Sequence, residues 1–465
     1  MSREDAVAAA TAYVDQGGFE EELARRVAIR SESQNPDAGP EIDRYLTEEM
    51  TPSLEALGFS CQILPNPMAG GWPFLVAERI EDPDLPTLLT YGHGDVVLGL
   101  PEEWREGLDP WVLKREADRL YGRGAADNKG QHTINMAALR AVLDTRGKLG
   151  FNVRYLIEMG EETGSPGLGE FCEQHKDLLE SDVLIASDGP RSSFDRPTLF
   201  LGARGGFNFN MDVNLREGGH HSGNWGGLLA NPATILLNAI ATITTAKGKI
   251  LLPDLLPPGI PDSVKAALSD IEHDGGEDAP EIDPDWGEPG LSTAEQVHAW
   301  NSFEVLAFTA GNPERPVNAI PPSARATCQI RFTVGVEPTQ FLDILRKHLD
   351  DNGFPMIELS MARKNYARAT RLDPEHPWVQ FCESSLTRTT NKKTAVLPSL
   401  GGTLPNDVFA DGLGLPTVWV PHSYTGCCQH APNEHLLLPV VREALRLMTG
   451  LFWDMGEGET PRKAA

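Results

Sequence analysis

Short apolar runs alternate with longer stretches of helical periodicity along much of this chain. Near the N-terminus, Phe19, Leu23 and Val27 recur at helical spacing. Continuous apolar strands separated by helices are typical of a mostly parallel sheet with helices on both faces. The runs that carry this interpretation are residues 87–91, 153–157, 183–186 and 417–420, and helical patterns at 133–143 and 169–179 lie between them.

The hydrophobic pattern changes near Arg204. Residues 206–214 alternate apolar and polar positions, as a half-exposed strand does, and a helical pattern follows at 231–245. A second alternating run at 326–334 and a second helical pattern at 340–352 complete the set. This order predicts a small two-layer α+β domain of ferredoxin-like type, inserted into a larger α/β domain.

The length supports two domains, because 465 residues exceed the roughly 250–300 that a single core accommodates. We predict a catalytic domain formed by residues 1–203 and 366–465, with residues 204–365 as the inserted domain. Within the insert, residues 248–302 are rich in proline, glycine and acids, so we expect a surface excursion there. A role in an interface or in substrate gating is the alternative.

The charge balance excludes some classes of partner. The chain has 67 acidic and 40 basic residues, and its formal net charge of −27 disfavours nucleic acids and anionic membrane surfaces. No run approaches the roughly 20 apolar residues of a membrane helix, and the N-terminus lacks a signal-peptide pattern. Six cysteines without CxxC spacing indicate reduced thiols. We therefore expect a soluble, cytoplasmic protein.

Potential metal ligands follow three of the four apolar runs. His93 and Asp95 follow the first run, Glu161 and Glu162 follow the second, and Asp188 follows the third. Ligands of open α/β sheets bind beyond the carboxyl ends of the strands. These side chains are therefore expected to share one crevice.

Two further segments fit the same crevice. Asp127 lies in a glycine-rich loop before a helix, and His430 lies in the long loop after the fourth apolar run. Imidazole and carboxylate ligands together suit zinc, with cobalt or manganese as substitutes. Each piece alone has an ordinary alternative, such as a loop histidine, a solvated Glu-Glu pair or an aspartate that caps a turn. Their common position at strand ends is what favours a metal site.

The residues in this order resemble the M20 family of metallopeptidases, particularly its carnosinase-like dipeptidases and the related aminoacylases. The resemblance covers nearly the whole chain, and six ordered motifs are specific where one alone would be weak. The motifs are HGD at 93–95, GRGAADNKG at 122–130, EETGS at 161–165, SD at 187–188, HSG at 221–223 and HAPNE at 430–434.

The resemblance implies two divalent metal ions, which we expect to be Zn²⁺, with Co²⁺ or Mn²⁺ as alternatives. The implied ligands are His93 and Asp188 for one ion, Glu162 and His430 for the other, and Asp127 as the bridge between them.

Three further residues would act beside the metal ions. Asp95 would hydrogen-bond the far ring nitrogen of His93 and fix its tautomer. Glu161 would be the general base, which takes a proton from metal-bound water and passes it to the departing amine. His221 would stabilise the developing oxyanion, reaching in from the other subunit of a homodimer whose inserted domain serves as a lid. The alternative for His221 is that it caps a local turn.

The resemblance also implies a subsite for the substrate. Asn318 and Arg331 match positions that bind its terminal carboxylate and carbonyl region, and an arginine fork suits a carboxylate. Gly401, Gly402 and Thr403 resemble a turn that approaches the same carboxylate, because backbone without Cβ permits close approach. The alternative for Arg331 is an exposed strand residue.

Together these residues predict a dinuclear metal-dependent hydrolase that cleaves the amide bond of a dipeptide or N-acyl amino acid with a free carboxylate. Carnosinase-like members usually have a second acid after the bridging aspartate, whereas this chain has Asn128. That departure favours N-acyl or N-carbamoyl substrates as the alternative. A catalytically silent relative would be expected to lack Glu161 or a ligand, and a single-metal amidase would have little use for Asp127.

Overall fold

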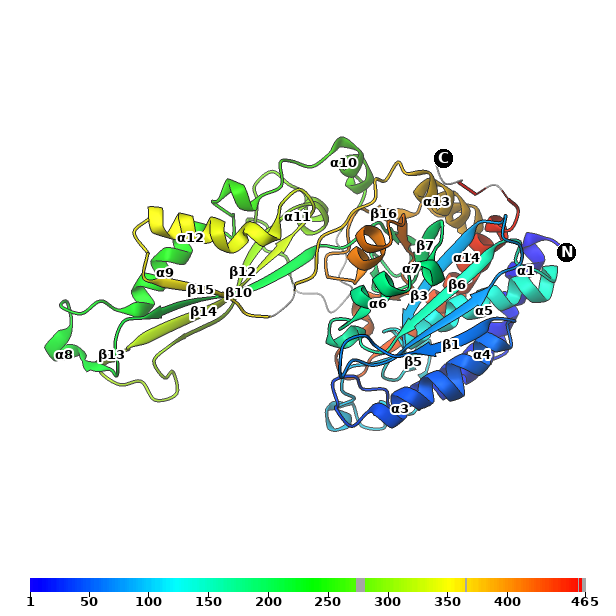
Figure 1. The fold of residues 1–465 in the computed structure, drawn as a ribbon, viewed down its shortest axis with the longest axis horizontal. Helices are drawn as coiled ribbons and strands as arrows, with labels where there is room; N and C mark the ends of the chain where they lie inside the picture. The colour runs from blue at the N-terminus through cyan, green and yellow to red at the C-terminus, as the bar shows by residue number, and fades with distance from the viewer. Residues whose placement is uncertain (273–280, 364–365, 459, 462–465) are drawn as a thin grey trace.

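Two bodies, each built around one sheet, lie side by side in the computed structural model (Figure 1). The structure describes residues 1–272, 281–363, 366–458 and 460–461. The larger body contains both chain ends and an eight-stranded sheet, and the smaller body contains a four-stranded sheet. Among the helices in these ranges, none is both long and apolar enough to cross a bilayer.

The eight-stranded sheet has a parallel centre. Strands pair in parallel from β6 through β3 and β7 to β17, while the edge strands β1 and β2 are antiparallel. The four predicted apolar runs form this centre, so the predicted fold class is confirmed. In order across the sheet, the strands are β1 (Ser60–Leu64), β2 (Phe74–Arg79), β6 (Asn152–Glu158), β3 (Thr87–His93), β7 (Val183–Ala186), β17 (Thr417–Trp419), β9 (Thr198–Phe200) and β16 (Ala395–Leu397).

Apolar side chains on the two faces of this sheet belong to two separate core clusters. Neighbouring residues of one strand alternate between them, so Leu88 packs in one cluster and Leu89 in the other. Helices therefore cover both faces. The helices of this body are α1 (Arg3–Asp15), α2 (Gly18–Val27), α3 (Gly39–Arg44), α4 (Thr51–Glu55), α5 (Lys129–Arg146), α6 (Leu168–Gln174), α7 (Lys176–Leu179), α13 (Pro377–Thr390) and α14 (Leu438–Met455).

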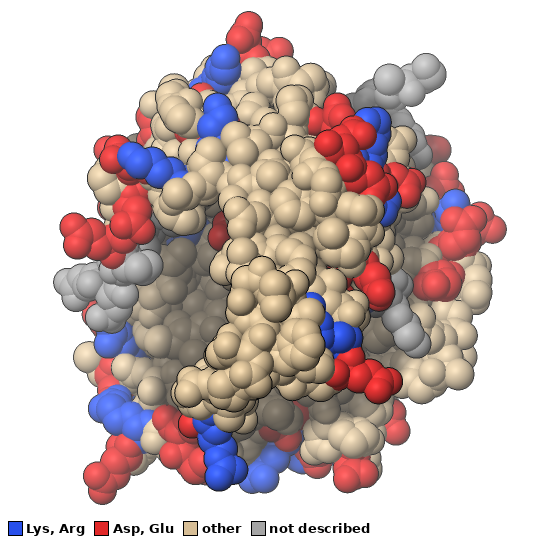
Figure 2. Space-filling model, turned by 90° about the vertical axis from the view of Figure 1, so that its left-hand side faces the viewer, with Lys and Arg blue, Asp and Glu red and all other residues tan. Residues whose placement is uncertain are grey.

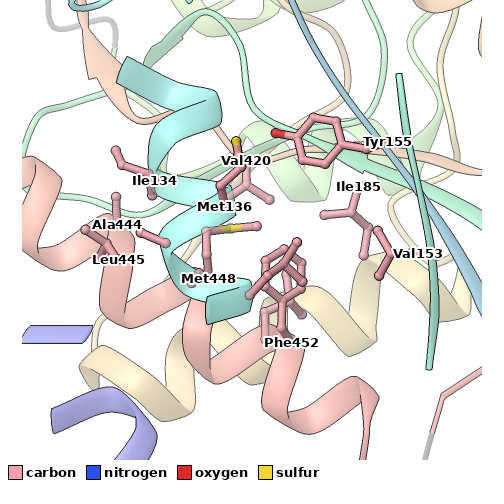
Figure 3. Packing of buried hydrophobic residues seen from close by; sticks show 14 of the residues in the cluster. Ile134, Met136, Val153, Tyr155, Ile185, Val420, Ala444, Leu445, Met448 and Phe452 are labelled. Carbon is pink, nitrogen blue, oxygen red and sulfur yellow. The ribbon is translucent and has the colours of Figure 1, made fainter. Parts of the chain in front are cut away.

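Helix α5 follows directly on the loop that contains Asp127 and is buried along most of its length. It packs beside α14, where Met136 lies near Met448 and Phe452 (Figure 3). It ends at Gly147, whose φ of 79° is the left-handed conformation that glycine adopts without strain. Full burial of such side chains contributes about 1.5–3 kcal/mol each, so α5 is a rigid support for the loop before it.

The smaller body combines an antiparallel sheet with helices packed on it in one core cluster. The predicted strand–helix–strand–helix pattern is present, and β12 and β15 add the two outer strands. Residues 204–365 remain our proposed extent of the insert, although positions 364–365 lie outside the described residues. Its elements are β10 (Gly205–Asn214), β11 (His220–His221), α8 (Ser222–Trp225), α9 (Pro232–Ile243), β12 (Ser302–Ala310), β13 (Ala319–Ile320), β14 (Ser323–Phe332), α12 (Phe341–Asp351) and β15 (Ile357–Met361).

The acidic excursion at 248–302 is more ordered than its composition indicates. It contains α10 (Asp262–Leu268) and α11 (Thr293–Ala299), and residues 273–280 within it lie outside the described part of the chain. Leu268 and Ala294 are buried in the same core cluster as Leu397 of the large sheet. Ile250, Leu252 and Leu255, at its start, are buried in the core cluster of the insert. The apolar side chains of this polar segment therefore attach it to both bodies.

Two small sheets join loops around the larger body. One pairs β8 (Pro190–Arg191) with β18 (Ser423–Tyr424). The other pairs β19 (His435–Leu437) with β5 (Arg119–Tyr121), and β5 with β4 (Lys114–Glu116). The β5–β19 pairing brings the end of the late HAPNE motif beside the glycine-rich loop, although the two are some three hundred residues apart in sequence.

Candidate metal centre

Three strands of the parallel centre deliver acids and a histidine to one place. His93 is the last residue of β3, Glu162 lies in a 3₁₀ turn just after β6, and Asp188 follows β7 by two residues. Parallel strands end on the same edge of the sheet, so their first loop residues become neighbours. Asp127, before α5, and His430, in the loop before β19, complete the group.

These five side chains form two groups that share one member. One ligand atom each from His93, Asp127 and Asp188 lies within 4.8 Å of the others, and the same holds for Asp127, Glu162 and His430. Asp127 uses a different oxygen in each direction. Its Oδ1 is 3.0 Å from His93 Nε2, and its Oδ2 is 3.1 Å from His430 Nε2. Each group could hold a cation, and the Asp127 carboxylate is common to both.

Asp95 organises the centre from behind. Its carboxylate is fully buried, and Oδ1 and Oδ2 accept the backbone N–H groups of Glu161 and Glu162 at 3.2 and 3.1 Å. His93 Nδ1 lies 3.4 Å from Oδ1 and 3.1 Å from the Asp95 carbonyl oxygen. Asp95 therefore orients both the His93 ring and the backbone of Glu161 and Glu162. The predicted contact to the far ring nitrogen of His93 is present, and this nitrogen lies near both the carboxylate and the carbonyl oxygen of Asp95.

The loop that holds Asp127 is fixed by Glu434, a residue whose role the motif alone did not indicate. The Glu434 carboxylate is 1% exposed and accepts the backbone N–H groups of Gly124, Ala126 and Asp127 at 3.0, 2.8 and 3.0 Å. Its charge is balanced by Arg123 Nη1 at 2.9 Å. Arg123 lies in the GRGAADNKG motif and Glu434 in the HAPNE motif. Membership of these motifs is the only feature of the sequence that indicates a role for them.

Crowded acids shift one another's pKa in this centre. Burial and the charge of Asp127 raise the pKa of Glu162 to about 7 and that of Asp188 to about 6. Burial would also raise the pKa of Asp127, but the hydrogen bonds with His430 and His93 lower it below its ordinary value. The same bond to Asp127, with one to Glu162, raises the pKa of His430 to about 11. So much buried negative charge favours divalent cations.

Glu161 lies at the centre but in neither ligand group. Burial raises the pKa of its carboxyl well above the ordinary value; the charge of His93 opposes this shift, and those of Asp188 and Glu162 add to it. A carboxyl group with a raised pKa beside a cation site can both accept and return a proton near neutral pH.

Arg331 and the Gly401–Thr403 turn lie close together where the two bodies meet. A Cβ built on Gly206 would be 3.3 Å from Arg331 Nη1 and 3.6 Å from the Thr403 methyl group. Arg331 Nε donates to Gln329 on the same strand at 3.1 Å. Arg331 and the Gly401–Thr403 turn, which are both predicted for the substrate carboxylate subsite, are therefore neighbours.

His221 and Asn318 lie elsewhere, at the outer tip of the smaller body. Both are exposed, and the chain around α8 and β13 forms the end farthest from the eight-stranded sheet (Figure 1). β11 pairs with β13, and Ser222 donates to the Asn318 carbonyl oxygen at 2.8 Å, so the two residues are held together. His221 Nδ1 also accepts the N–H of Gly223, which makes it a local cap. Within one chain, neither joins Arg331.

Asn128, next in sequence to Asp127, lies against Ser187 and His132. It has no exposed surface, its Nδ2 donates to the Ser187 carbonyl oxygen at 2.8 Å, and its Oδ1 is 3.2 Å from His132 Nδ1. Because its side chain is buried against these residues, Asn128 is not exposed to contact a substrate amine directly.

Comparison with known proteins places these residues in context. The family described as peptidase family M20/M25/M40 matches residues 89–454. The human protein "Beta-Ala-His dipeptidase" is 33% identical over 283 residues, which are 56% of this chain and 55% of that protein. The chain thus spans about half the length of that relative.

Two further similarities cover more of the chain. The "Cysteinylglycine-S-conjugate dipeptidase" of Corynebacterium striatum is 27% identical over 83% of this chain and 82% of its own length. An M20 family metallo-carboxypeptidase from Sulfolobus solfataricus superposes with a TM-score of 0.78 at 23% identity, over 94% of this chain and 99% of its own. The structural match supports the fold alone.

Proposed function

Because the chain belongs to peptidase family M20/M25/M40, we propose that it is a metal-dependent hydrolase of small amide substrates with a free carboxylate, and foremost a dipeptidase. The observation that carries this proposal is the pair of ligand groups sharing Asp127. Relatives named as dipeptidases support the peptide substrate. Asn128 is buried and gives no reason to prefer N-acyl or N-carbamoyl substrates over dipeptides. We keep those substrates as the alternative.

The donor chemistry of the centre fits two zinc ions, with cobalt or manganese as substitutes. Each group offers one imidazole and two carboxylates, which are borderline and hard donors in the proportion that zinc accepts. His93 and Asp188 would hold one ion, Glu162 and His430 the other, and Asp127 both. When bound, such a pair lowers the pKa of water toward about 7 and polarises a carbonyl group.

Glu161 would move the proton in this reaction. Its neighbour Glu162 is a ligand, and Asp95 holds the backbone N–H groups of both, so the Glu161 carboxylate is delivered to the edge of the cation sites. A carboxylate oxygen of Glu161 would accept the proton of the attacking water and return it to the nitrogen of the departing amine. The high pKa of this group makes the protonated form accessible for the second step.

The substrate carboxylate would lie between Arg331 and the Gly401–Thr403 turn. Guanidinium N–H groups bind a carboxylate in bidentate fashion, and glycine at two of the turn positions allows the backbone to come close. The scissile amide would then lie between this charged anchor and the ligand groups, and a free carboxylate would be required for tight binding.

We propose that His221 and Asn318 act in trans, across a homodimer formed through the insert. Both residues are exposed at the tip, with no path to the metal centre of their own chain (Figure 1). The tip also exposes Trp225, Leu228 and Val317, at 45%, 76% and 76%. Viewed from this end, the insert presents a broad surface almost without charged residues (Figure 2), although the net charge is −27. An uncharged apolar surface on an acidic chain suits a second copy.

The proposed function is tested by metal removal and replacement. Chelated protein should lose activity on dipeptides, and zinc, cobalt or manganese should restore it with two ions per chain by elemental analysis. Asp127→Asn should lose both ions and activity together, because both groups use this carboxylate. Asp454→Asn, which alters a buried acid paired with Arg3, is the control and should keep both ions. Activity that survives chelation, or one tightly bound ion per chain, would contradict the proposal.

The same assay decides between substrate classes. Dipeptides are compared with N-acetyl, N-succinyl and N-carbamoyl amino acids that carry the same C-terminal residue. We expect the highest kcat/KM for dipeptides. Turnover confined to the N-acyl or N-carbamoyl compounds would make the alternative correct.

A further inference from the structure

Arg204 is a buried cation without an acidic partner. Its side chain is 9% exposed, and its guanidinium donates to two neutral acceptors, the carbonyl oxygens of Gly401 at 3.0 Å and Trp300 at 3.4 Å. Within the described part of the chain, no carboxylate approaches it to ion-pair distance. A buried charge that is balanced only by carbonyl dipoles is costly, and an anionic ligand would offset that cost.

A second guanidinium lies nearby. Burial and the charge of Arg331 lower the pKa of Arg204 to about 10, and the more distant Glu304 acts in the opposite direction. Arg331 itself contacts Gln329 and forms no ion pair among the described residues. Two like charges therefore converge beside the Gly401–Thr403 turn, in a chain whose formal net charge is −27. Such a concentration of positive charge attracts anions.

Helix α11 of the acidic excursion packs against the Gly401–Thr403 turn and lies beside Arg204. His298, 7% exposed, has Nδ1 2.8 Å from the Ser399 carbonyl oxygen, just before the turn. The Val297 side chain comes within 2.9 Å of where a Cβ on Gly401 would be. Trp300, just after the helix, supplies the carbonyl oxygen that accepts from Arg204. The excursion thus positions both the turn and the arginine.

We propose that Arg204 is a second anion-binding residue of the substrate carboxylate subsite, acting beside Arg331, and that helix α11 keeps this subsite in shape. The inference rests on the proposed function, because it concerns the same subsite. Two guanidinium groups favour substrates that end in a free acid over the corresponding amides. They favour most those whose C-terminal residue carries a second carboxylate, namely aspartate or glutamate.

The first test compares three matched dipeptides, ending in glutamate, in alanine and in alanine amide. Arg204→Gln should raise KM for the alanine acid about tenfold, and more for the glutamate peptide, while kcat and the kinetics of the amide change little. Arg204→Lys keeps the charge and should recover part of the loss. Arg325→Gln, at an exposed arginine paired with Asp212, is the control of equal charge change. If Arg204→Gln weakened kcat/KM equally for the acid and the amide peptides, Arg204 would have only a structural role and the proposal would be wrong.

Binding provides a readout that does not depend on turnover. Calorimetry should show that wild-type protein binds glutamate more tightly than its α-amide, isoglutamine, and that Arg204→Gln abolishes this difference. If wild type hydrolyses none of the peptides but shows this Arg204-dependent preference, the proposed function fails and the anion subsite stands. If wild type hydrolyses them and Arg204→Gln alters neither KM nor binding, the subsite proposal alone is wrong.

The role of α11 is tested by a steric double substitution. Gly401→Ala introduces a methyl group against Val297 and should raise KM for acid substrates several-fold, because the turn must shift. Adding Val297→Ala removes the contact and should restore KM toward wild type. Thermal midpoints of all variants identify any general loss of folding. A double variant no better than Gly401→Ala would show that α11 does not control the turn.

Discussion

The metal centre and the tip of the insert both contain residues of the proposed reaction, but they are built in opposite ways. At the centre, all five candidate ligand residues belong to one chain, and the backbone of the loop around Asp127 is hydrogen-bonded to the buried Glu434. At the tip, the exposed His221 side chain accepts a hydrogen bond from Gly223 of its own turn, far from the metal centre of the same chain. The difference supports the proposed division of the site, in which one chain would provide the metal centre and a second copy would provide His221.

The first way to sharpen this comparison is to disable the centre without dismantling it. Glu161→Gln keeps the size of the side chain and removes the proton acceptor, so kcat should fall by about 10²–10⁴-fold. Metal content should stay at the wild-type level, because Glu161 is in neither ligand group. Steady-state kinetics and elemental analysis of the same preparation check both statements. Loss of an ion in this variant would instead make Glu161 a ligand.

The second way is to disable the tip. His221→Ala should lower kcat by roughly 10²–10³-fold through loss of the oxyanion donor, with metal content unchanged. If the residue acts in trans, mixing this variant with Glu161→Gln should restore activity after subunit exchange. An equal mixture forms hybrid dimers with one intact site, so roughly a quarter of wild-type activity is expected. His220→Ala is the neighbouring control and should remain active.

The outcome of mixing separates the two arrangements. Recovery requires that one chain contributes the centre and the other contributes His221. A mixture that stays inactive, although exchange is verified by differently tagged subunits, would mean that His221 acts in its own chain or not at all. The comparison between the two regions would then be wrong.

The third and smallest effect concerns the support of the centre. Glu434→Gln removes the charge that pairs with Arg123 and accepts three backbone N–H groups, so the bridging loop should loosen. We expect about 10–100-fold weaker metal binding, with kcat near wild type at saturating metal. Metal titration of the chelated protein measures this. Glu443→Gln, which breaks the pair with the buried Arg191, is the matched control and should lower only the thermal midpoint.

Particular residues show how far the sequence could lead. The strands that end near His93, Glu162 and Asp188 were evident from apolar runs, because buried parallel strands have a strong local signal. The insert was evident from the change to alternating residues after Arg204, although the predicted strand at 326–334 begins earlier, at Ser323. The composition of the acidic excursion indicated a surface segment but not which of its residues are buried, because a few apolar side chains such as Leu268 pack against the core through tertiary contacts.

The sequence by itself determined which side chains are candidate metal ligands. It also determined that three of them, His93, Glu162 and Asp188, lie at the ends of parallel strands, which must meet on one edge of the sheet. Tertiary structure alone decided what fixes them: Glu434 reaches the loop of Asp127 across 307 positions in sequence. It also placed α11 behind the Gly401–Thr403 turn, and His221 far from the centre of its own chain. Contacts of this kind depend on how distant segments pack, and packing across hundreds of residues leaves no periodic pattern in the sequence.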